Sequence, residues 1–409
     1  MGASTPTSAA YGRIARLREA MAAQEMAAFY VRDVSNIRWL TGFDGVFDGE
    51  AAHALYVDAN RVVLHTDSRY ATACETAAAA LGGTVQVDAR KTTHMDFAAE
   101  LWYGTCSERG ERDRFGIEDG ISLAEYRKLT NAFGEKLRQL VGAEAGEAPS
   151  APLASDALDA PDATLYPLRL RETSGLVLGL REVKDADEVA RMRAAQAITD
   201  AAFAHIAGFM RPGMTEREVQ LELESFMLRS GAEGLAFSSI VATGANGANP
   251  HAIPGETRLE AGQCVVMDFG ARARGYCSDM TRMVFLGEPD TRLREAYAVL
   301  RRANEEVQAM LRPGVTGKEA HELAERILDE GGFGGRMGHG LGHGVGLDIH
   351  EEPMLAPRNE RALAVGNVVT VEPGIYLPGD FGMRLEDFGI ITETGFDRFT
   401  RSTHDMVVV

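Results

Sequence analysis

Two pairs of acidic residues are spaced so that the members of each pair could face each other across a β-hairpin. Asp268 and Asp279 flank one predicted hairpin, and Glu372 and Glu386 flank a second. Like charges directly opposite each other on neighbouring strands destabilise a sheet. Because the arrangement occurs twice, the sequence predicts that these carboxylates bind a cation.

The expected pairing depends on where each hairpin turns. A two-residue turn at Ala273-Arg274 places the two aspartates opposite each other, and a turn at Pro378-Gly379-Asp380 does the same for the two glutamates. Gly379 supplies the flexible backbone that such a turn needs. A slip in either register would separate the members of a pair.

Two explanations of the acidic pairs stay open at this point. Arg282 and Arg384 are near enough in sequence to neutralise the carboxylates as structural partners. We favour metal ions, because the arginine side chains would have to occupy the same space as all four carboxylates. Four negative charges balance two divalent cations, and oxygen ligands with one nitrogen suit manganese, cobalt or zinc.

Three histidines lie in a glycine-rich stretch, HGLGHGVGLDIHEEP, which runs from His339 to Pro353. Glycine occupies every even position from Gly338 to Gly346, which disfavours a helix. In an extended conformation His339 and His343 share one face, and the glycine face lets another backbone approach closely. No GKS or GKT sequence follows, so a phosphate-binding loop is not indicated.

The composition argues against several classes of partner. The 409 residues carry a formal net charge of −18, which disfavours binding to nucleic acid. The four cysteines form no CxxC pair, which disfavours a structural zinc cluster or a disulfide framework and favours a reducing compartment. No apolar run approaches the roughly 20 residues of a membrane span. We therefore expect a cytoplasmic protein without membrane association.

The sequence predicts two domains of mixed α/β (α+β) structure. Residues 1–172 alternate helical and strand patterns, as in a small α/β domain, and include an Ala-, Pro- and acid-rich segment at 142–163 that we interpret as an exposed loop. Residues 173–409 contain an internal duplication, since RPGMTEREV recurs as RPGVTGKEA and LEAGQCVVMDFG is echoed by LAVGNVVTVEPG. A duplicated fold places equivalent residues about one centre.

Five motifs carry a resemblance to a known family. VMDFG, YCSDMTR, GHGVGLDIHEEP, TVEPG and RLED follow one another as in the aminopeptidase P/prolidase family of metallopeptidases, and NIRWLTGF resembles that family's N-terminal domain. The resemblance covers most of the chain. It implies a creatinase/prolidase-like N-terminal domain, a C-terminal catalytic domain with the duplicated pita-bread fold, and a homodimer.

The resemblance also implies a role for each candidate residue. Two metal ions, with manganese expected before cobalt or zinc, would be held by Asp268, Asp279, His343, Glu372 and Glu386. Three further histidines match positions near the substrate: His251 near the leaving group, His350 at the scissile carbonyl, and His339 in contact with the substrate. Arg358 and Arg384 are candidates for binding a substrate carboxylate, because a guanidinium group can donate two parallel hydrogen bonds to its two oxygens.

The implied reaction is hydrolysis of the peptide bond before proline. A proline nitrogen carries no hydrogen, so a protease that must bind the N–H of the scissile bond fails there. Attack on the carbonyl by a metal-bound hydroxide does not need this N–H. Glu372 would act as the general base, His350 would stabilise the developing oxyanion, and His251 would protonate the leaving nitrogen. We expect an aminopeptidase acting on peptides with proline at the second position. The alternative is an Xaa-Pro dipeptidase, that is, a prolidase.

Two rival classes share the fold of this family. Some relatives are metal-independent hydrolases or lyases of small non-peptide substrates, and others are non-catalytic binding proteins. Such relatives have lost metal ligands, whereas all five ligand positions are intact in this chain. The intact set therefore favours the metallopeptidase.

Overall fold

The computed structural model describes residues 6–104, 114–145 and 169–409 of the chain. The chain divides into two compact units, Met1–Leu180 and Arg181–Val409, and each is described by itself. The domain boundary expected between residues 172 and 173 falls within the last strand of the first unit, so its exact position stays a prediction. The loop expected at 142–163 lies outside the described residues, apart from residues 142–145, which are helical.

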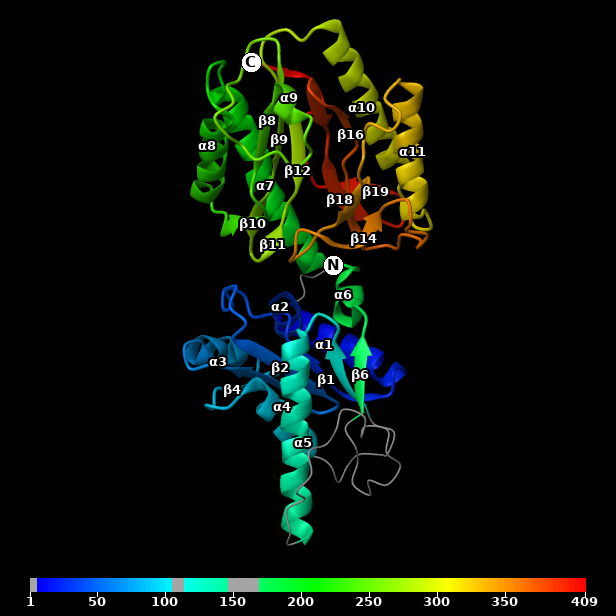
Figure 1. Cartoon of the computed structure of the whole chain (residues 1–409). Helices are drawn as coiled ribbons and strands as arrows, with labels where there is room; N and C mark the ends of the chain where they lie inside the picture. Colours follow the sequence, from blue (N-terminus) through cyan, green and yellow to red (C-terminus); the bar gives the residue numbers. More distant parts are fainter. Residues whose placement is uncertain (1–5, 105–113, 146–168) are drawn as a thin grey trace. The chain divides into compact units, whose positions relative to one another are not determined.

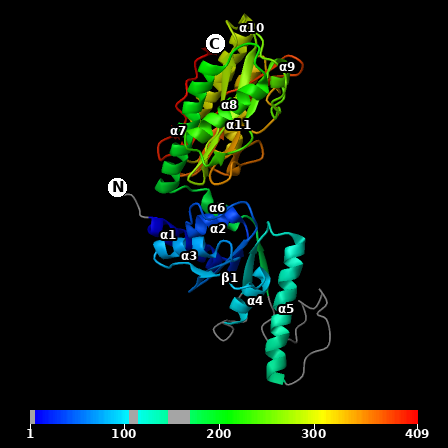
Figure 2. The same cartoon turned by 90° about the vertical axis from the view of Figure 1, so that its left-hand side faces the viewer.

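The N-terminal unit is built on one six-stranded sheet with the strand order β4-β3-β2-β1-β5-β6. The strands are β1 (Met26–Val31), β2 (His53–Asp58), β3 (Val62–Thr66), β4 (Gln86–Asp88), β5 (Arg114–Glu118) and β6 (Leu170–Thr173). The helices are α1 (Pro6–Ala23), α2 (Val34–Thr41), α3 (Ala71–Ala80), α4 (His94–Tyr103), α5 (Leu123–Ala145) and α6 (Leu176–Arg181). Alternate residues such as Ala28, Tyr30 and Tyr56 pack with α4 and α5 on one face, while α1, α2 and α3 gather away from them (Figure 2). The sheet is therefore covered by helices on both faces.

The C-terminal unit contains two larger sheets, ordered β20-β12-β9-β8 and β14-β13-β15-β18-β19. Its helices are α7 (Ala186–Phe209), α8 (Glu216–Arg229), α9 (Gly244–Gly247), α10 (Thr291–Met310) and α11 (Gly317–Glu330). Its strands are β7 (Gly234–Leu235), β8 (Ile240–Thr243), β9 (Cys264–Phe269), β10 (Ala271–Ala273), β11 (Tyr276–Cys277), β12 (Met280–Phe285), β13 (Gly342–Gly344), β14 (Glu351–Leu355), β15 (Val368–Val371), β16 (Gly374–Leu377), β17 (Phe381–Arg384), β18 (Asp387–Ile391), β19 (Phe396–Arg398) and β20 (Val407–Val408).

Two helix pairs flank the sheets of this unit (Figure 1). Val265 and Met267 of β9 pack in one core with residues of α7 and α8. Val369 and Val371 of β15 pack in a second core with residues of α10 and α11. None of the helices in the described parts of the chain is both long and apolar enough to cross a membrane.

The predicted internal duplication is confirmed by matching local structure in the two halves. Thr215 caps α8 and Thr316 caps α11, each through a capping box, and both helices are 14 residues long. Each capping threonine also forms an isolated antiparallel bridge, Thr215 with Arg258 and Thr316 with Ala362. The same chain segments therefore make the same connections in both halves.

The first hairpin turns one residue later than predicted. Ala273 of β10 faces Tyr276 of β11, which leaves Arg274 and Gly275 as the turn residues. Both have a positive φ, of 50° and 81°, as a type I′ turn requires. The predicted turn at Ala273-Arg274 is wrong, because the glycine is needed inside the turn.

This correction changes the residue opposite Asp268 but not the face on which the aspartates lie. Asp268 of β9 pairs with Thr281 of β12 instead of Asp279. Moving a hairpin turn by one residue shifts the pairing by two, and side chains two positions apart share one face of a strand. The two carboxylates therefore still point to the same side.

The second hairpin has the predicted register. Leu377 of β16 faces Phe381 of β17, which leaves residues 378–380 as the turn. The pairing of β15 with β18 beyond this hairpin continues the same register. Glu372 and Glu386 lie between these two sets of pairs and so stand opposite each other, which confirms the predicted arrangement.

Candidate active site

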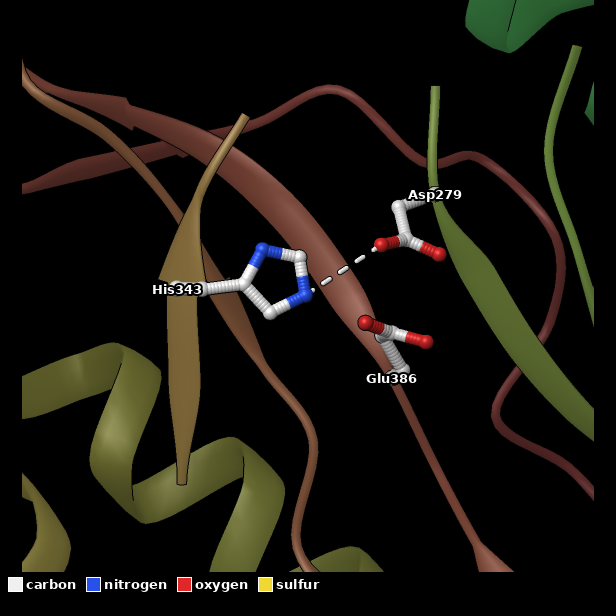
Figure 3. A group of neighbouring side chains, drawn as sticks. All are labelled: Asp279, His343 and Glu386. Atoms are coloured by element: carbon white, nitrogen blue, oxygen red, sulfur yellow. Dashed lines mark ion pairs between the residues drawn. The ribbon is translucent and has the colours of Figure 1, made fainter. Parts of the chain in front are cut away.

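The predicted metal ligands meet in the C-terminal unit. Asp279 precedes β12, His343 lies in β13, Glu386 lies between β17 and β18, and the three side chains point toward one another (Figure 3). One ligand atom of each lies within 4.8 Å of the others. His343 Nε2 is 3.5 Å from Asp279 Oδ2 and 3.5 Å from Glu372 Oε1. Asp268 lines the same cavity.

The glycines around His343 allow its strand to lie close to its neighbours. A Cβ atom at Gly342 would collide with the backbone carbonyl of Thr370 in β15. A Cβ atom at Gly344 would collide with the backbone carbonyl of Glu352 in β14. The repeated glycines therefore serve close packing of β13 between two strands, which fixes the imidazole of His343 in the cavity.

His343 has the hydrogen bonding of a nitrogen ligand. Its Nδ1 lies 3.0 Å from the carbonyl oxygen of Gly344, which can only accept, so Nδ1 carries the hydrogen. Nε2 is left with its lone pair toward the carboxylates. Burial lowers the pKa of His343 to about 4, which keeps the ring neutral. A neutral imidazole with its second nitrogen held by a carbonyl is the usual form of a metal-binding histidine.

Burial and mutual repulsion act on the carboxylates of the cluster. Burial, followed by the charges of Glu386, Asp268 and Glu372, raises the pKa of Asp279 well above its usual range. Burial, followed by Glu372 and Asp268, does the same to the pKa of Glu386. Burial also raises the pKa of Glu372 to about 8, although Arg384 opposes the shift. Bound cations would reverse these shifts.

Only one carboxylate of the cluster forms a direct ion pair with an arginine among the described residues. Arg384 Nη2 donates to Asp268 Oδ2 at 2.5 Å, whereas Arg282 pairs with Asp387 outside the cluster. Asp268 Oδ1 is buried without a hydrogen-bond partner among the described residues, and such an atom is costly unless it binds something. Four carboxylates and one imidazole therefore fit a pair of divalent ions.

Two threonine hydroxyls that the sequence reasoning missed hold the glutamates in place. Thr281 Oγ1 donates to Glu386 Oε2 at 2.7 Å and accepts from Arg384 Nε at 3.0 Å. Thr370 Oγ1 lies 3.3 Å from Glu372 Oε1. Thr370 stands two positions before Glu372, so strand parity could have placed it. Thr281 could be found only from the corrected register of the first hairpin.

The predicted substrate-contacting histidines all line the cavity. His251 and His350 are exposed, and the His350 ring centroid lies 4.4 Å from that of His343. His339 is half-buried, with Nδ1 2.7 Å from the carbonyl oxygen of Gly340 and Nε2 3.1 Å from Tyr376 Oη. Because the carbonyl can only accept, Nε2 of His339 accepts the hydroxyl hydrogen of Tyr376.

The two predicted carboxylate-binding arginines differ in position. Arg384 lines the cavity, but its N–H groups donate to Asp268, Thr281 and the hydroxyl of Tyr376. Arg358 is exposed and is not among the residues that line the cavity in the described parts of the chain. Its role in substrate binding stays a prediction.

The predicted metal ligands lie in a cavity of about 920 Å³. Apolar side chains contribute to its lining, and they include Phe237, Ile253, Ile349 and Met354. Ile253 is 87% exposed, in the same loop as His251. The cavity thus combines a polar centre with an apolar surface, as small-molecule and peptide sites usually do.

Comparison with known proteins identifies both units. Residues 190–393 match metallopeptidase family M24, and residues 13–145 match the creatinase/prolidase N-terminal domain. The Xaa-Pro dipeptidase of Pyrococcus furiosus is 37% identical over 237 residues, which cover 58% of this chain and 68% of that protein. The matched region spans about two thirds of the curated relatives, 65% and 68% in two cases.

Solved structures resemble almost the whole chain. The Xaa-Pro dipeptidase from Bacillus anthracis has a TM-score of 0.81 at 32% identity, with 98% of this chain and 100% of that chain covered. The X-Pro aminopeptidase from Thermotoga maritima has a TM-score of 0.78 at 30% identity, with 97% and 100% covered. These matches confirm the predicted family resemblance and fold class. The chain therefore belongs to metallopeptidase family M24 and carries a creatinase/prolidase N-terminal domain.

Proposed function

We propose that this chain hydrolyses the Xaa-Pro bond at the N-terminus of peptides. The observation that carries the proposal is the convergence of four carboxylates and one imidazole in a cavity with apolar walls. The cavity volume lies near the upper end of the roughly 300–1,000 Å³ typical of ligand sites, which leaves room beyond a dipeptide. The second candidate is an Xaa-Pro dipeptidase, which the names of two similar proteins favour.

The residues proposed to hold two divalent ions are Asp268, Asp279, His343, Glu372 and Glu386. The ions would polarise the scissile carbonyl and lower the pKa of water. We propose manganese before cobalt or zinc, because oxygen donors dominate the set.

Polar side chains of the cavity would transfer protons, stabilise the oxyanion and contact the substrate. Glu372 accepts a proton from the attacking water through its carboxylate. His350, exposed beside His343, donates a hydrogen bond to the carbonyl oxygen as negative charge develops there. His251 donates a proton to the departing proline nitrogen. His339 is held by Tyr376 and contacts the substrate.

Two further parts of the proposal rest on other grounds. A homodimer is expected from the family resemblance. A cytoplasmic location is expected from the cysteine pattern and the composition.

The experiment compares Xaa-Pro, Xaa-Pro-Yaa and Xaa-Ala-Yaa peptides with manganese present. We expect cleavage before proline and none before alanine, with the ratio of tripeptide to dipeptide rates separating aminopeptidase from dipeptidase.

Asp279→Asn should lower kcat/KM by more than the roughly 10–100-fold typical of residues that only support a ligand. Asp380→Asn is the matched control, since Asp380 pairs with Arg292 at the surface. Cleavage of neither Xaa-Pro peptide would overturn the substrate assignment, and full activity of Asp279→Asn would overturn the metal assignment.

A further inference from the structure

The two glutamates proposed as metal ligands, Glu372 and Glu386, stand at a break in the strand pairing. The strands β15 and β18 pair on one side of the break, and β16 and β17 pair on the other. Inside the break, Pro373 has no N–H to donate, and its carbonyl oxygen accepts a long bond, of 3.3 Å, from the N–H of Leu385. Like charges that face each other push neighbouring strands apart. The glutamates therefore face each other where backbone pairing is weak.

The backbone N–H groups of the two glutamates do not strengthen this pairing. The N–H of Glu372 donates to the carbonyl oxygen of Leu341 at 2.8 Å, and the N–H of Glu386 donates to that of Thr281 at 3.1 Å. Each bond ties a glutamate to a third segment of the chain. Another group is needed to hold the two glutamate strands at a fixed separation.

Asn304 of α10 bridges the two strands with its side-chain amide. Its Nδ2 donates to the carbonyl oxygen of Val371 at 2.9 Å and to that of Leu385 at 3.1 Å. Val371 directly precedes Glu372, and Leu385 directly precedes Glu386. One amide group thus holds the peptide groups that come immediately before both glutamates.

The orientation of this amide is fixed by Gln308, one turn later on α10. Gln308 Nε2 donates to Asn304 Oδ1 at 2.6 Å and to Asp387 Oδ2 at 2.7 Å. Because Asn304 Oδ1 accepts from Gln308, its Nδ2 faces the two backbone carbonyl groups, which can only accept. Both hydrogens of the Asn304 amide and its oxygen are therefore used.

Asn304 is a polar residue on an apolar face of its helix. It is fully buried, and its neighbours Leu300, Ala303 and Val307 belong to the apolar core that contains Val371. A buried amide costs free energy unless it is hydrogen-bonded, and asparagine is a poor helix former. An apolar residue would suit the helix better but could not donate to either carbonyl group. The residue type at this position therefore fits the bridge and not the helix.

We propose that Asn304 is a positioning residue that sets the separation of the Glu372 and Glu386 carboxylates, so that two divalent ions can bind side by side. The inference rests on the proposed metal centre and deepens it. Two-metal sites in proteins hold their ions roughly 3.5–4 Å apart, so the spacing of the ligands decides whether both ions bind. Residues behind metal ligands typically change metal affinity about 10–100-fold.

The test compares manganese binding by Asn304→Leu and by the wild type. Leucine is close to asparagine in shape but donates to neither carbonyl group. We expect the dissociation constant for manganese, measured by calorimetry on metal-free protein, to rise about 10–100-fold. Electron paramagnetic resonance should show the magnetic coupling of two neighbouring manganese ions in the wild type. The coupling should be lost in Asn304→Leu at the same manganese concentration.

Asn367→Leu is the matched control. Asn367 is also a buried asparagine of the C-terminal unit, and its Nδ2 donates to the backbone carbonyl oxygen of Glu182 at 3.2 Å. Both replacements remove an amide that donates to the backbone, so both should lower the temperature of thermal unfolding. Only Asn304→Leu should weaken manganese binding and remove the magnetic coupling.

A milder variant keeps the proposal testable if Asn304→Leu does not fold. Gln308 is half-buried, and Gln308→Leu removes the bond that orients the Asn304 amide without changing the buried face of α10. We expect the affinity for manganese to fall about fivefold, as for the loss of one hydrogen bond. An unchanged affinity in this variant would contradict the proposal.

The outcomes separate the role of Asn304 from the metal centre itself. Wild-type affinity and coupling in Asn304→Leu would overturn the positioning role and leave the metal centre standing. An equal loss of affinity in Asn367→Leu would do the same, because the effect would then follow from reduced stability. If the wild type binds no manganese, the proposed metal centre is overturned together with this inference.

Discussion

At the scale of single residues, threonine hydroxyl groups contact two of the predicted ligand carboxylates. Thr281 Oγ1 links Glu386 to Arg384, and Arg384 in turn holds Asp268. One threonine thus orients a carboxylate from the second half of the duplication and, through an arginine, another from the first half. Groups that orient ligands in this way tune metal affinity.

Replacing Thr281 tests this arrangement. Thr281→Val keeps the shape of the side chain but removes the donor to Glu386 and the acceptor for Arg384. We expect metal affinity to fall about 10–100-fold, measured by competition with a chelator of known affinity. Thr281→Ser restores the hydroxyl and should recover most of the affinity. Equal affinity of the valine variant and the wild type would mean that the hydroxyl does not orient the ligand.

The ligand candidates could be predicted from residue type and spacing. The residues that lie opposite them in the sheet could not. Four carboxylates flanking two hairpins predict a cation because repulsion must be offset. The pairing of Asp268 with Thr281 depends on a type I′ turn, which places Arg274 and Gly275 at positive φ. Only the backbone geometry distinguishes a turn at residues 273–274 from one at residues 274–275.

At the scale of elements, a buried ion cluster fixes the segment beside His350. Glu351 opens β14 and accepts from Arg181 Nη2 at 2.5 Å and from Lys184 Nζ at 2.9 Å, with all three side chains buried. Burial alone would raise the pKa of Glu351, but Lys184 and Arg181 outweigh it and lower the pKa to about 2. The cluster connects the start of the C-terminal unit to the strand after the glycine-rich stretch.

Glu351→Gln should therefore destabilise the protein and change its dependence on pH. Removing one partner of a buried ion cluster typically costs about 3–5 kcal/mol in the free energy of unfolding. Because the folded pKa is depressed, the carboxylate stabilises the wild type fully above its unfolded pKa, and this stabilisation is lost as the pH falls from about 4.5 towards 2. Denaturant unfolding at pH 7 and at acid pH should show a large loss at pH 7 that narrows at acid pH.

Glu352→Gln provides the control for this experiment, since Glu352 is the exposed neighbour of Glu351. It should unfold as the wild type does at both pH values. A loss of stability in Glu351→Gln that is the same at every pH would show that the carboxylate charge does not stabilise the fold.

At the scale of the whole molecule, the duplication explains why one site contains two carboxylate pairs. Each half of the C-terminal unit contributes one pair, and the matching bridges at Thr215 and Thr316 show that the halves share one local plan. The repeated sequence motifs predicted this plan, because repeated helix caps and strands recur at the same spacing. The sequence offered Arg384 as a partner of the carboxylates in general, but its specific contacts with Asp268 and Tyr376 depend on how the two halves meet.

We propose that the five clustered residues bind two divalent ions that are required for cleavage before proline. The most direct measurement is a titration of metal-free protein with manganese, following bound metal and cleavage of an Xaa-Pro-Yaa peptide in the same samples. We expect negligible cleavage without metal, and an activity that rises until two ions are bound to each chain. Full cleavage by the metal-free protein, or no metal binding at all, would contradict it.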